Sequence, residues 1–366
     1  MRVALLIPLL WGVSQCQGLD KGSPPQLDGF PIWSSVVTKL QVAAASNPLV
    51  ATYKSIGTTR GGRAIPSLEL HFHDASVSKD RNGKKSGGVD LRPVSVMFSM
   101  VQPREALGMA ALLNIMDRAL EAASAASQPE NDPVLAAIKH SRVVFIPILN
   151  PDGYEILRKN YPESKDAIVK NGASGLCRNE STTTHGVNLG HNWDFEWNYK
   201  IITSEDYTNP CDLSYRGPDP FSEPETRALR DLLIQENPKS VIIFHSRHIS
   251  HESRILVPFM FHQSSFMQNN TKLQMLSDSD IAVYKNITSE MQAALPLKEH
   301  EYTVGTSWET IQHTISGSDL DWIFENTRAY SIILQLGTDE GSYWPSPELI
   351  SGLIEKVRSW SVVFSS

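Results

Sequence analysis

The sequence lacks long apolar runs, clusters of basic residues and internal repeats. Beyond the N-terminus no stretch reaches 18 apolar residues, so we expect no membrane-spanning helix and no membrane partner. No Lys/Arg cluster forms a basic stripe and the formal net charge is −7, which argues against nucleic acid as a partner. No low-complexity tract is long enough to be a linker, so we expect one domain over residues 28–366.

The N-terminus has the pattern of a secretory signal peptide. Arg2 supplies a positive charge, and the segment VALLIPLLWGV (3–13) is an apolar run too short to span a bilayer. Small and polar residues follow this run. We therefore expect a signal peptide over residues 1–18 and a polar lead-in over residues 19–27, with a buried N-terminal strand as the alternative.

Cysteine is scarce, and its placement fits a secreted protein. Cys16 falls within the expected signal, which leaves Cys177 and Cys211 as an even pair. In an oxidising compartment such a pair favours one disulfide, with two free thiols as the alternative. The chain also has three glycosylation sequons, which begin at Asn179, Asn269 and Asn286. Each sequon is weak evidence alone, and together they support a secreted or extracellular location.

Strand-like and helix-like segments alternate along the chain. Apolar segments typical of strands cover residues 67–72, 94–101, 142–149, 240–244 and 330–336. Helical spacing of apolar residues covers residues 34–45, 106–126, 223–236 and 346–360, and SEPE (222–225) has the pattern of a capping box. This alternation predicts an α/β domain with a mixed central sheet flanked by helices, with functional sites at the carboxyl ends of the strands.

A series of short motifs is spread along the chain. They are IG (56–57), RGGRAI (60–65), QPRE (102–105), ILNPDGY (148–154), GVNLGHNWD (186–194), YRGPDPFSEPET (215–226), HS (245–246), SGSDLDW (316–322) and YS (330–331). The series resembles the zinc carboxypeptidase A/B family over roughly residues 28–362, and its order and spacing argue against chance. The resemblance implies that family's fold, and the two late cysteines fit its disulfide. It also leaves no room for the family's N-terminal activation segment, so we expect no pro-form.

The resemblance places the family's three zinc ligands on Gln102, Glu105 and His245. A catalytic zinc requires three protein ligands and an open position for water. The first ligand is histidine in the family, whereas a glutamine amide is a neutral and weak ligand. Asn188 replaces the carboxylate that orients this histidine, so both changes are consistent with loss of one imidazole. Zinc is thus the cofactor of the family, and its binding here is doubtful.

The resemblance also implies positions for the general base, the oxyanion arginine and the substrate-binding residues. Gln335 occupies the position of the general base, and a neutral amide cannot accept a proton at neutral pH. Arg158 is the candidate for the arginine that stabilises the oxyanion. The family's Asn-Arg pair that binds the terminal carboxylate falls on Gly190 and His191. The substrate-binding positions implied are Arg104, Gly190, His191, Gln312 or His313, Leu320 and Ser246.

Several of these positions have a second interpretation. Gln335 alone could be a polar residue of a core strand, and Gln102 a loop residue whose amide donates to Glu105. The three histidines of HSRHISH (245–251) have two interpretations. They could form a metal site that replaces the lost ligand, or only His245 belongs to the site and the other two lie in a loop. Leu320 lies where the family sets its side-chain preference, and an apolar residue there would suit a ligand with an apolar C-terminal residue. The neighbouring Asp319 leaves a preference for a basic C-terminal residue as the alternative.

Two functions follow from these interpretations. We expect a secreted zinc-carboxypeptidase-like protein that is inactive or severely impaired and binds a peptide or protein C-terminus. The alternative is an active metallocarboxypeptidase that removes single C-terminal residues through zinc-activated water. That alternative needs a substitute base and ligand, which the sequence does not reveal. A purely structural role has no positive support.

Overall fold

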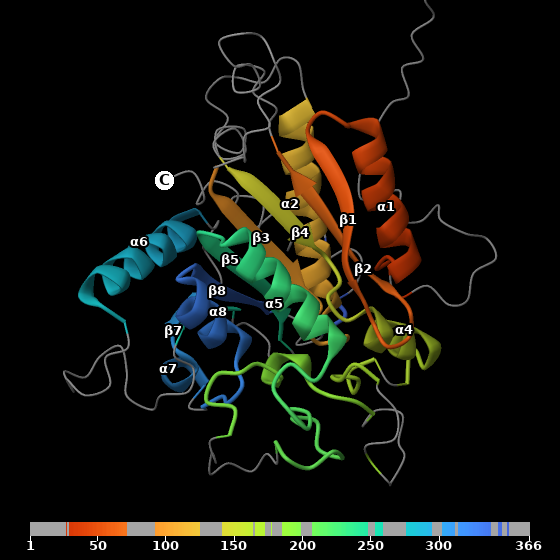
Figure 1. Cartoon of the computed structure of the whole chain (residues 1–366), viewed down its shortest axis with the longest axis vertical. Helices are drawn as coiled ribbons and strands as arrows, with labels where there is room; N and C mark the ends of the chain where they lie inside the picture. The colour runs from red at the N-terminus through yellow and green to blue at the C-terminus, as the bar shows by residue number, and fades with distance from the viewer. Residues whose placement is uncertain are drawn as a thin grey trace, which may run out of the picture.

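A computed structural model describes most of the chain. It covers residues 27, 29–71, 92–124, 141–163, 165–172, 177, 185–198, 207–247, 253–258, 276–294, 302–311, 314–337, 343–345 and 350. Within these residues, an eight-stranded sheet carries helices on both faces (Figure 1). None of the described helices is long and apolar enough to cross a lipid bilayer.

The sheet is mixed, as the sequence predicts. Its strands are β1 (Ala51–Thr58), β2 (Ala64–Leu70), β3 (Val94–Ser99), β4 (Arg142–Ile146), β5 (Ser240–Ser246), β6 (Ser253–Leu256), β7 (Tyr302–Gly305) and β8 (Tyr330–Leu336). Their order across the sheet is β1-β2-β4-β3-β5-β8-β6-β7. The central strands β4, β3, β5 and β8 are parallel. On the two flanks, β2 is antiparallel to β4 and β6 is antiparallel to β8.

The central strands form because their sequences are almost wholly apolar. Every residue of β3 is buried, as are all residues of β5 after the first. A parallel strand covered on both faces contains a continuous apolar run rather than an alternating pattern. The serine hydroxyls at the start of these strands, on Ser95 and Ser240, are hydrogen-bonded to each other at 2.8 Å.

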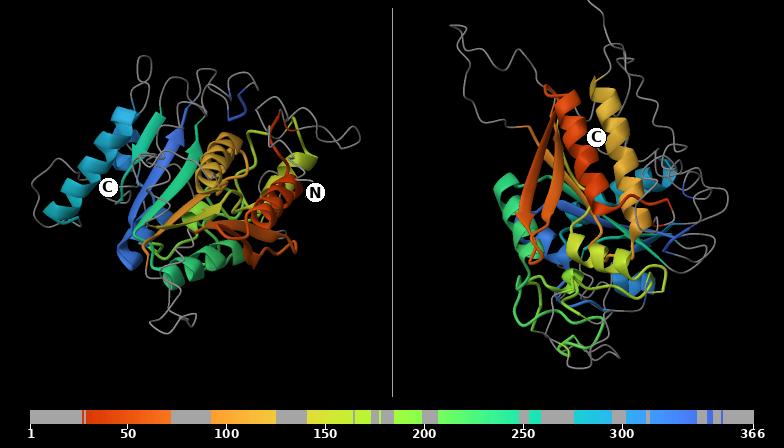
Figure 2. Two further views of the ribbon diagram at one scale, coloured as in Figure 1. Left: turned by 90° about the horizontal axis from the view of Figure 1, so that it is seen from above. Right: turned by 90° about the vertical axis from the view of Figure 1, so that its right-hand side faces the viewer.

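The helices cover both faces of the sheet. They are α1 (Trp33–Ser46), α2 (Ala106–Ser124), α4 (Pro151–Lys159), α5 (Pro224–Glu236), α6 (Asp278–Ala294), α7 (Ser307–Ile311) and α8 (Asp319–Thr327), with a 3₁₀ turn η3 (Leu189–His191). Helices α1 and α2 lie on one face of the sheet, and α5 lies on the other, where it packs beside α8 (Figure 2). This is a layered α/β architecture around one core.

The predicted elements are largely confirmed, with two corrections. The five predicted strands correspond to β2, β3, β4, β5 and β8, and three predicted helices correspond to α1, α2 and α5. Helix α5 has its N-cap at Glu223 with no side-chain capping bond, so the predicted capping box at Ser222 does not form. The sequence predicted no helix over α4, whose N-cap is Asn150 with its side chain accepting from the Gly153 N–H at 3.0 Å. Of the predicted helix over 346–360, only Ile350 lies within the described residues.

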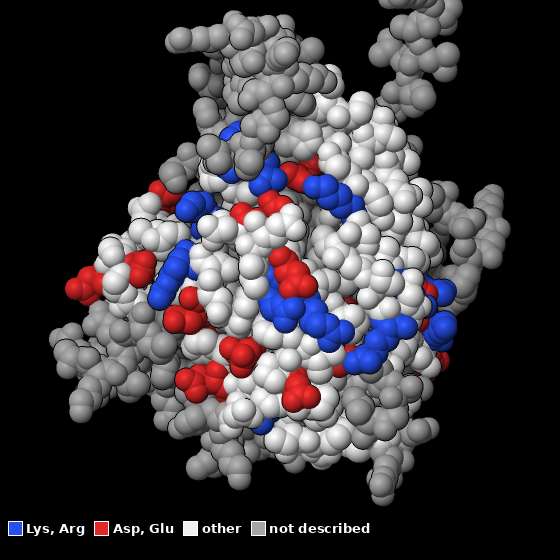
Figure 3. Space-filling model, in the orientation of Figure 1, with Lys and Arg blue, Asp and Glu red and all other residues white. Residues whose placement is uncertain are grey.

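The disulfide is present as expected. Cys177 and Cys211 are joined across a separation of 34 residues. On the face of the molecule shown in Figure 3, basic and acidic side chains are interspersed. Arg142 is one basic residue with acidic partners, since it bridges Glu69 and Glu236 at 2.7 and 2.6 Å.

Candidate functional site

Three neighbouring parallel strands end at the same edge of the sheet, where the predicted site residues gather. Glu105 follows β3 after a short turn, His245 lies near the end of β5, and Gln335 lies near the end of β8. His245 and Gln335 are register partners across β5 and β8. Side chains at partnered positions lie on the same face of a sheet. The fold therefore brings together positions that are 230 residues apart in the chain.

Glu105 and His245 form a direct ion pair at this edge. Their Oε2 and Nδ1 atoms are 2.8 Å apart, and the two residues are only 3% and 8% exposed. Burial by itself lowers the pKa of the His245 imidazole. The charge and hydrogen bond of Glu105, together with the charge of Asp319, outweigh this effect, so the pKa of His245 lies above its ordinary value. The imidazole thus has a buried carboxylate as its partner.

Helix α2 holds this pair in place from one side. The Gly108 N–H donates to the Ser246 hydroxyl at 3.0 Å, so the predicted substrate-binding Ser246 is used to join α2 to β5. A Cβ atom at Gly108 would lie 2.8 Å from the carbonyl oxygen of Phe244. Glycine is required there because a larger residue would push α2 away from the strand.

The two glutamines bring neutral amides to the same region. The Oε1 atoms of Gln102 and Gln335 are buried without a hydrogen-bond partner in the described part of the chain. The Glu105 backbone N–H donates to the Gln102 carbonyl at 3.1 Å, but among the described residues the Gln102 side-chain amide makes no hydrogen bond to the Glu105 carboxylate, so the expected amide–carboxylate contact does not form. Arg254, which the sequence interpretation overlooked, is buried and is the register partner of Gln335 on β6.

The donor set does not fit a catalytic zinc ion. Glu105 and His245 are good ligands, but Gln102 offers only a neutral amide oxygen. Within the described ranges, no three His, Cys, Asp or Glu side chains converge in a way that could hold a metal ion. Glu105 and His245 instead contact each other.

Arg104 lies beside the ion pair and is held by its neighbours. Its guanidinium donates to the backbone carbonyl of Asp166 at 3.1 Å and lies 4.5 Å from the centre of the Tyr343 ring. Stacking on an aromatic face leaves the edge of a guanidinium able to donate hydrogen bonds. Tyr343 has no motif in the sequence, and only the tertiary structure places it at this site.

The predicted carboxylate-binding loop lies next to the start of α8. Gly190 and His191 belong to η3, whose N-cap Asn188 accepts from the Gly190 N–H at 3.1 Å. The His191 ring has its Nδ1 3.3 Å from the Ser316 carbonyl and packs edge-to-face on Tyr207 at 4.9 Å. Asn188 itself donates to the Leu213 carbonyl. Through these two hydrogen bonds Asn188 stabilises the loop and does not orient the imidazole ring of a metal ligand.

Residues 319 and 320 have different surroundings. Leu320 is fully buried, and its carbonyl accepts from the Ser331 hydroxyl at 3.1 Å. Asp319 is 4% exposed, and its Oδ2 is buried without a hydrogen-bond partner in the described residues. Burial raises the pKa of Asp319 to about 6, although the attraction of His245 opposes this. The carboxylate therefore lies within electrostatic reach of the ion pair.

Other predicted residues are not brought to this centre. Arg158 lies on α4, where its guanidinium is paired with Glu155 at 2.8 Å, and no described contact connects it with His245. Asn286 is exposed on α6 and donates to Glu290. The remaining predicted positions lie outside the described residues; they are Gln312, His313, His248, His251, Asn179 and Asn269.

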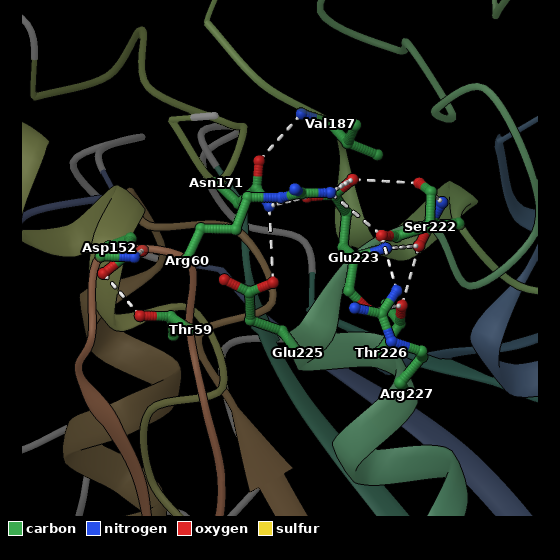
Figure 4. A network of polar contacts seen from close by, with 12 residues as sticks. Thr59, Arg60, Asp152, Asn171, Val187, Ser222, Glu223, Glu225, Thr226 and Arg227 are labelled. Atoms are coloured by element: carbon green, nitrogen blue, oxygen red, sulfur yellow. Dashed lines mark hydrogen bonds and ion pairs between the residues drawn. The ribbon is translucent and has the colours of Figure 1, made fainter. Parts of the chain in front are cut away.

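A network of polar contacts joins Arg60 and Asn171 to the start of α5 (Figure 4). The Asn171 amide donates to Glu223 at 2.6 Å and to Glu225 at 3.4 Å, and its oxygen accepts from the Val187 N–H. Arg60 pairs with Glu223 at 3.0 Å. One arginine thus faces two buried carboxylates. Burial raises the pKa of Glu225 to about 7, reinforced by the charges of Glu223 and Asp152.

The raised pKa makes the stability pH-dependent. The folded chain holds the Glu225 proton more tightly than the unfolded chain, so this group lowers the free energy of unfolding as pH rises from 4.5 to about 7. Glu225→Gln mimics the neutral acid. We expect this variant to have a free energy of unfolding up to about 3 kcal/mol higher than wild type at pH 8. At pH 4 the two free energies of unfolding should be similar. Urea unfolding across this range measures the difference.

A matched control is Asp231→Asn on the same helix, because Asp231 is exposed and its pair with Arg230 is worth little. The control variant should follow the wild-type pH dependence. Parallel curves for wild type and Glu225→Gln between pH 4 and pH 8 would show that the pKa of Glu225 is the same in the folded and unfolded chain, which would contradict the raised pKa.

The fold is a layered α/β domain with Glu105 and His245 in contact at the carboxyl ends of its parallel strands. A family model described as zinc carboxypeptidase matches residues 36–358. The chain therefore belongs to the zinc carboxypeptidase family. This confirms the family expected from the motifs.

Comparison with curated proteins gives two kinds of relative. The chain is 25% identical over 329 residues to a protein named inactive metallocarboxypeptidase ECM14 from Ajellomyces capsulatus (strain NAm1 / WU24), covering 85% of this chain and 48% of that protein. It is 33% identical over 181 residues to carboxypeptidase B of Helicoverpa zea, covering 49% and 37%. The chain thus spans about half the length of the first curated relatives it matches.

Solved structures support the fold. The crystal structure of carboxypeptidase A from Helicoverpa armigera superposes with a TM-score of 0.66 at 19% identity, over 96% of this chain and 77% of that one. Thrombin activatable fibrinolysis inhibitor superposes with a TM-score of 0.65 at 16% identity, over 96% and 79%. At these identities, the likeness concerns the architecture alone.

Proposed function

We propose that this chain is a non-catalytic member of the zinc carboxypeptidase family that binds the C-terminus of a peptide or protein without cleaving it. The observation that carries the proposal is the neutral amide of Gln335 directly beside His245 in the sheet. Hydrolysis by activated water needs a group that accepts the water's proton, and an amide does not. The relatives named inactive metallocarboxypeptidases support the same conclusion.

The remaining groups are suited to binding. Arg104 and His191 lie at family positions for the substrate, and a terminal carboxylate is a good acceptor for a guanidinium. The Glu105–His245 ion pair balances its own charges, so the centre needs no metal ion for electrostatic compensation. Loss of the metal and the base removes catalysis while the framework of the site is kept.

The proposal includes a secreted location. It is supported by the apolar N-terminal run after Arg2 and by the disulfide between Cys177 and Cys211, since disulfides persist in oxidising compartments. Expression of the full chain in a secretory host, followed by N-terminal sequencing of the medium fraction, tests the expected cleavage near residue 18.

The test of the function uses the purified full-length protein. We expect far less than one zinc per chain by elemental analysis and no shortening of a mixed peptide set by mass spectrometry. The same peptides should bind with a free carboxyl end and lose affinity when that end is amidated. An active carboxypeptidase at equal concentration is the positive control. Stoichiometric zinc with trimming that a chelator abolishes would overturn the proposal.

A further inference from the structure

One of the three glycosylation sequons lies on a described helix, and the proposed function does not use it. It is Asn286-Ile287-Thr288, in the middle of α6. Figures 1 and 2 show α6 at the flank of the molecule, outside the strands of the sheet. A sequon can accept an oligosaccharide on the nitrogen of its asparagine side chain. The surroundings of its two polar side chains therefore decide whether and when it can be modified.

One face of α6 is fixed against the rest of the fold. Its buried residues are Tyr284, Thr288 and Met291, which recur at the spacing of one helix face. The Tyr284 ring packs against the rings of Phe324 and Tyr330, with centroids 5.9 and 5.4 Å away. These contacts determine which side of α6 faces the core and which side faces solvent.

Asn286 lies on the solvent side of the helix. It follows Tyr284 by two residues, which places it about 200° around the helix from that buried ring. Its side chain is exposed, and its Nδ2 donates to Glu290 Oε1 at 3.0 Å, one turn further along. An amide nitrogen carries two hydrogen atoms. A sugar can therefore replace one of them while the other is still donated to Glu290.

Thr288 lies on the opposite side and is not accessible in the folded chain. It is buried, and its hydroxyl donates to the Tyr284 carbonyl one turn earlier at 2.8 Å. Valine has the same shape and would need no hydrogen bond at this buried position, so packing alone does not account for a threonine here. The transferase that modifies a sequon requires the hydroxyl at its third position. It can reach this hydroxyl only while α6 is not packed against the sheet.

We propose that Asn286 carries an N-linked oligosaccharide on the outer face of α6, attached before this helix packs against the sheet. The inference rests on the secreted location within the proposed function and does not depend on peptide binding. The donor is a lipid-linked oligosaccharyl diphosphate. A bond forms between the anomeric carbon of its first sugar and Asn286 Nδ2, and the bond from that carbon to the phosphate oxygen breaks. One amide proton is released as the diphosphate leaves, and nothing is oxidised or reduced.

The first experiment locates the sugar on the full chain expressed in a eukaryotic secretory host. Protein from the medium is treated with peptide N-glycosidase in heavy-oxygen water, which converts a glycosylated asparagine to labelled aspartate. Peptide mass spectrometry should find this label at position 286 in most of the molecules. Asn286→Gln and Thr288→Val should both lose it, the second with Asn286 still present. Thr288→Ser should keep it, and so should the matched control Lys285→Gln, which changes an exposed neighbour on the same helix.

The second experiment tests the timing. Folded full-length protein made without glycans is incubated with a single-chain oligosaccharyltransferase and the lipid-linked donor. A synthetic peptide of residues 282–292 serves as the unfolded substrate. We expect position 286 of the folded protein to be modified at least about ten-fold more slowly than the peptide, because its hydroxyl becomes accessible only when α6 opens.

The outcomes separate the site from the secreted location. Protein that reaches the medium with Asn286 unmodified would overturn the site, and the secreted location would stand. A chain that stays in the cells without any sugar would overturn both. If the folded protein is modified as fast as the peptide, attachment before packing is overturned.

Discussion

Restoring the family's catalytic residues is expected to give this chain a zinc ion and measurable release of C-terminal residues. The restoring variant combines Gln102→His, Asn188→Asp, Gly190→Asn, His191→Arg and Gln335→Glu. The first two rebuild an imidazole ligand and the carboxylate that orients it. Glu105 and His245 then complete a three-ligand set at the strand ends. We expect zinc to rise from a small fraction to about one per chain by elemental analysis.

The general base should account for a large part of the gained rate. A variant with the other four changes that retains Gln335 should bind zinc, yet cleave about 10² to 10⁴ times more slowly than the complete variant. Release of C-terminal residues, followed by mass spectrometry, measures the ratio. Arg254 is the register partner of position 335, so an introduced carboxylate has a cationic neighbour that makes it a weaker base. The gain should therefore fall toward the lower end of this range.

The backbone at position 190 leaves room for a side chain. A Cβ atom at Gly190 would lie 3.5 Å from Asn188 Oδ1 and 3.7 Å from Val101 Cγ1, which are ordinary contact distances. A complete variant that folds but takes up no zinc would contradict the assignment of position 102 to the metal centre. Zinc uptake without any cleavage would instead place the base at a residue other than 335.

Removing Trp193 is expected to cause the largest loss of stability among the single changes considered. Trp193 is 1% exposed, and its ring packs against Phe221 and Trp322 with centroids 5.4 and 5.3 Å away. Its indole N–H donates to the Leu189 carbonyl at 3.0 Å. Trp193→Ala leaves a large cavity between the site loop and α8. We expect the free energy of unfolding to fall by about 3–5 kcal/mol in urea titrations.

A milder variant separates packing from hydrogen bonding. Trp193→Phe retains most of the aromatic contact with Phe221 and Trp322 and loses the indole donor. Its expected loss is about 1–3 kcal/mol, because the Leu189 carbonyl keeps its place in a buried turn. An alanine variant that loses less than about 1 kcal/mol would mean that the loop repacks and does not depend on this ring.

The fold was largely predictable because its central strands are buried on both faces. A strand such as β3 must be apolar at every position, and this run is visible in the sequence without any partner. The edge strand β1 was not predicted, since its residues alternate irregularly between buried and exposed positions. Helix α4 was also not predicted, because the Asn-Pro-Asp-Gly sequence at its start is typical of a turn. The motifs suggested the site positions, but a motif does not give the distances between those residues in the folded chain.

The sequence by itself determined the family, the segments that form the central sheet, and the presence of neutral amides at positions 102 and 335. These properties depend on residue type and order along the chain. Only the tertiary structure decided that Glu105 pairs with His245, that Arg254 lies beside Gln335, and that Asp319 has a buried, unsatisfied oxygen atom. These contacts form between strand ends and loops that are far apart in the sequence. Burial and charge compensation depend on such contacts, so no local segment of the sequence reveals them.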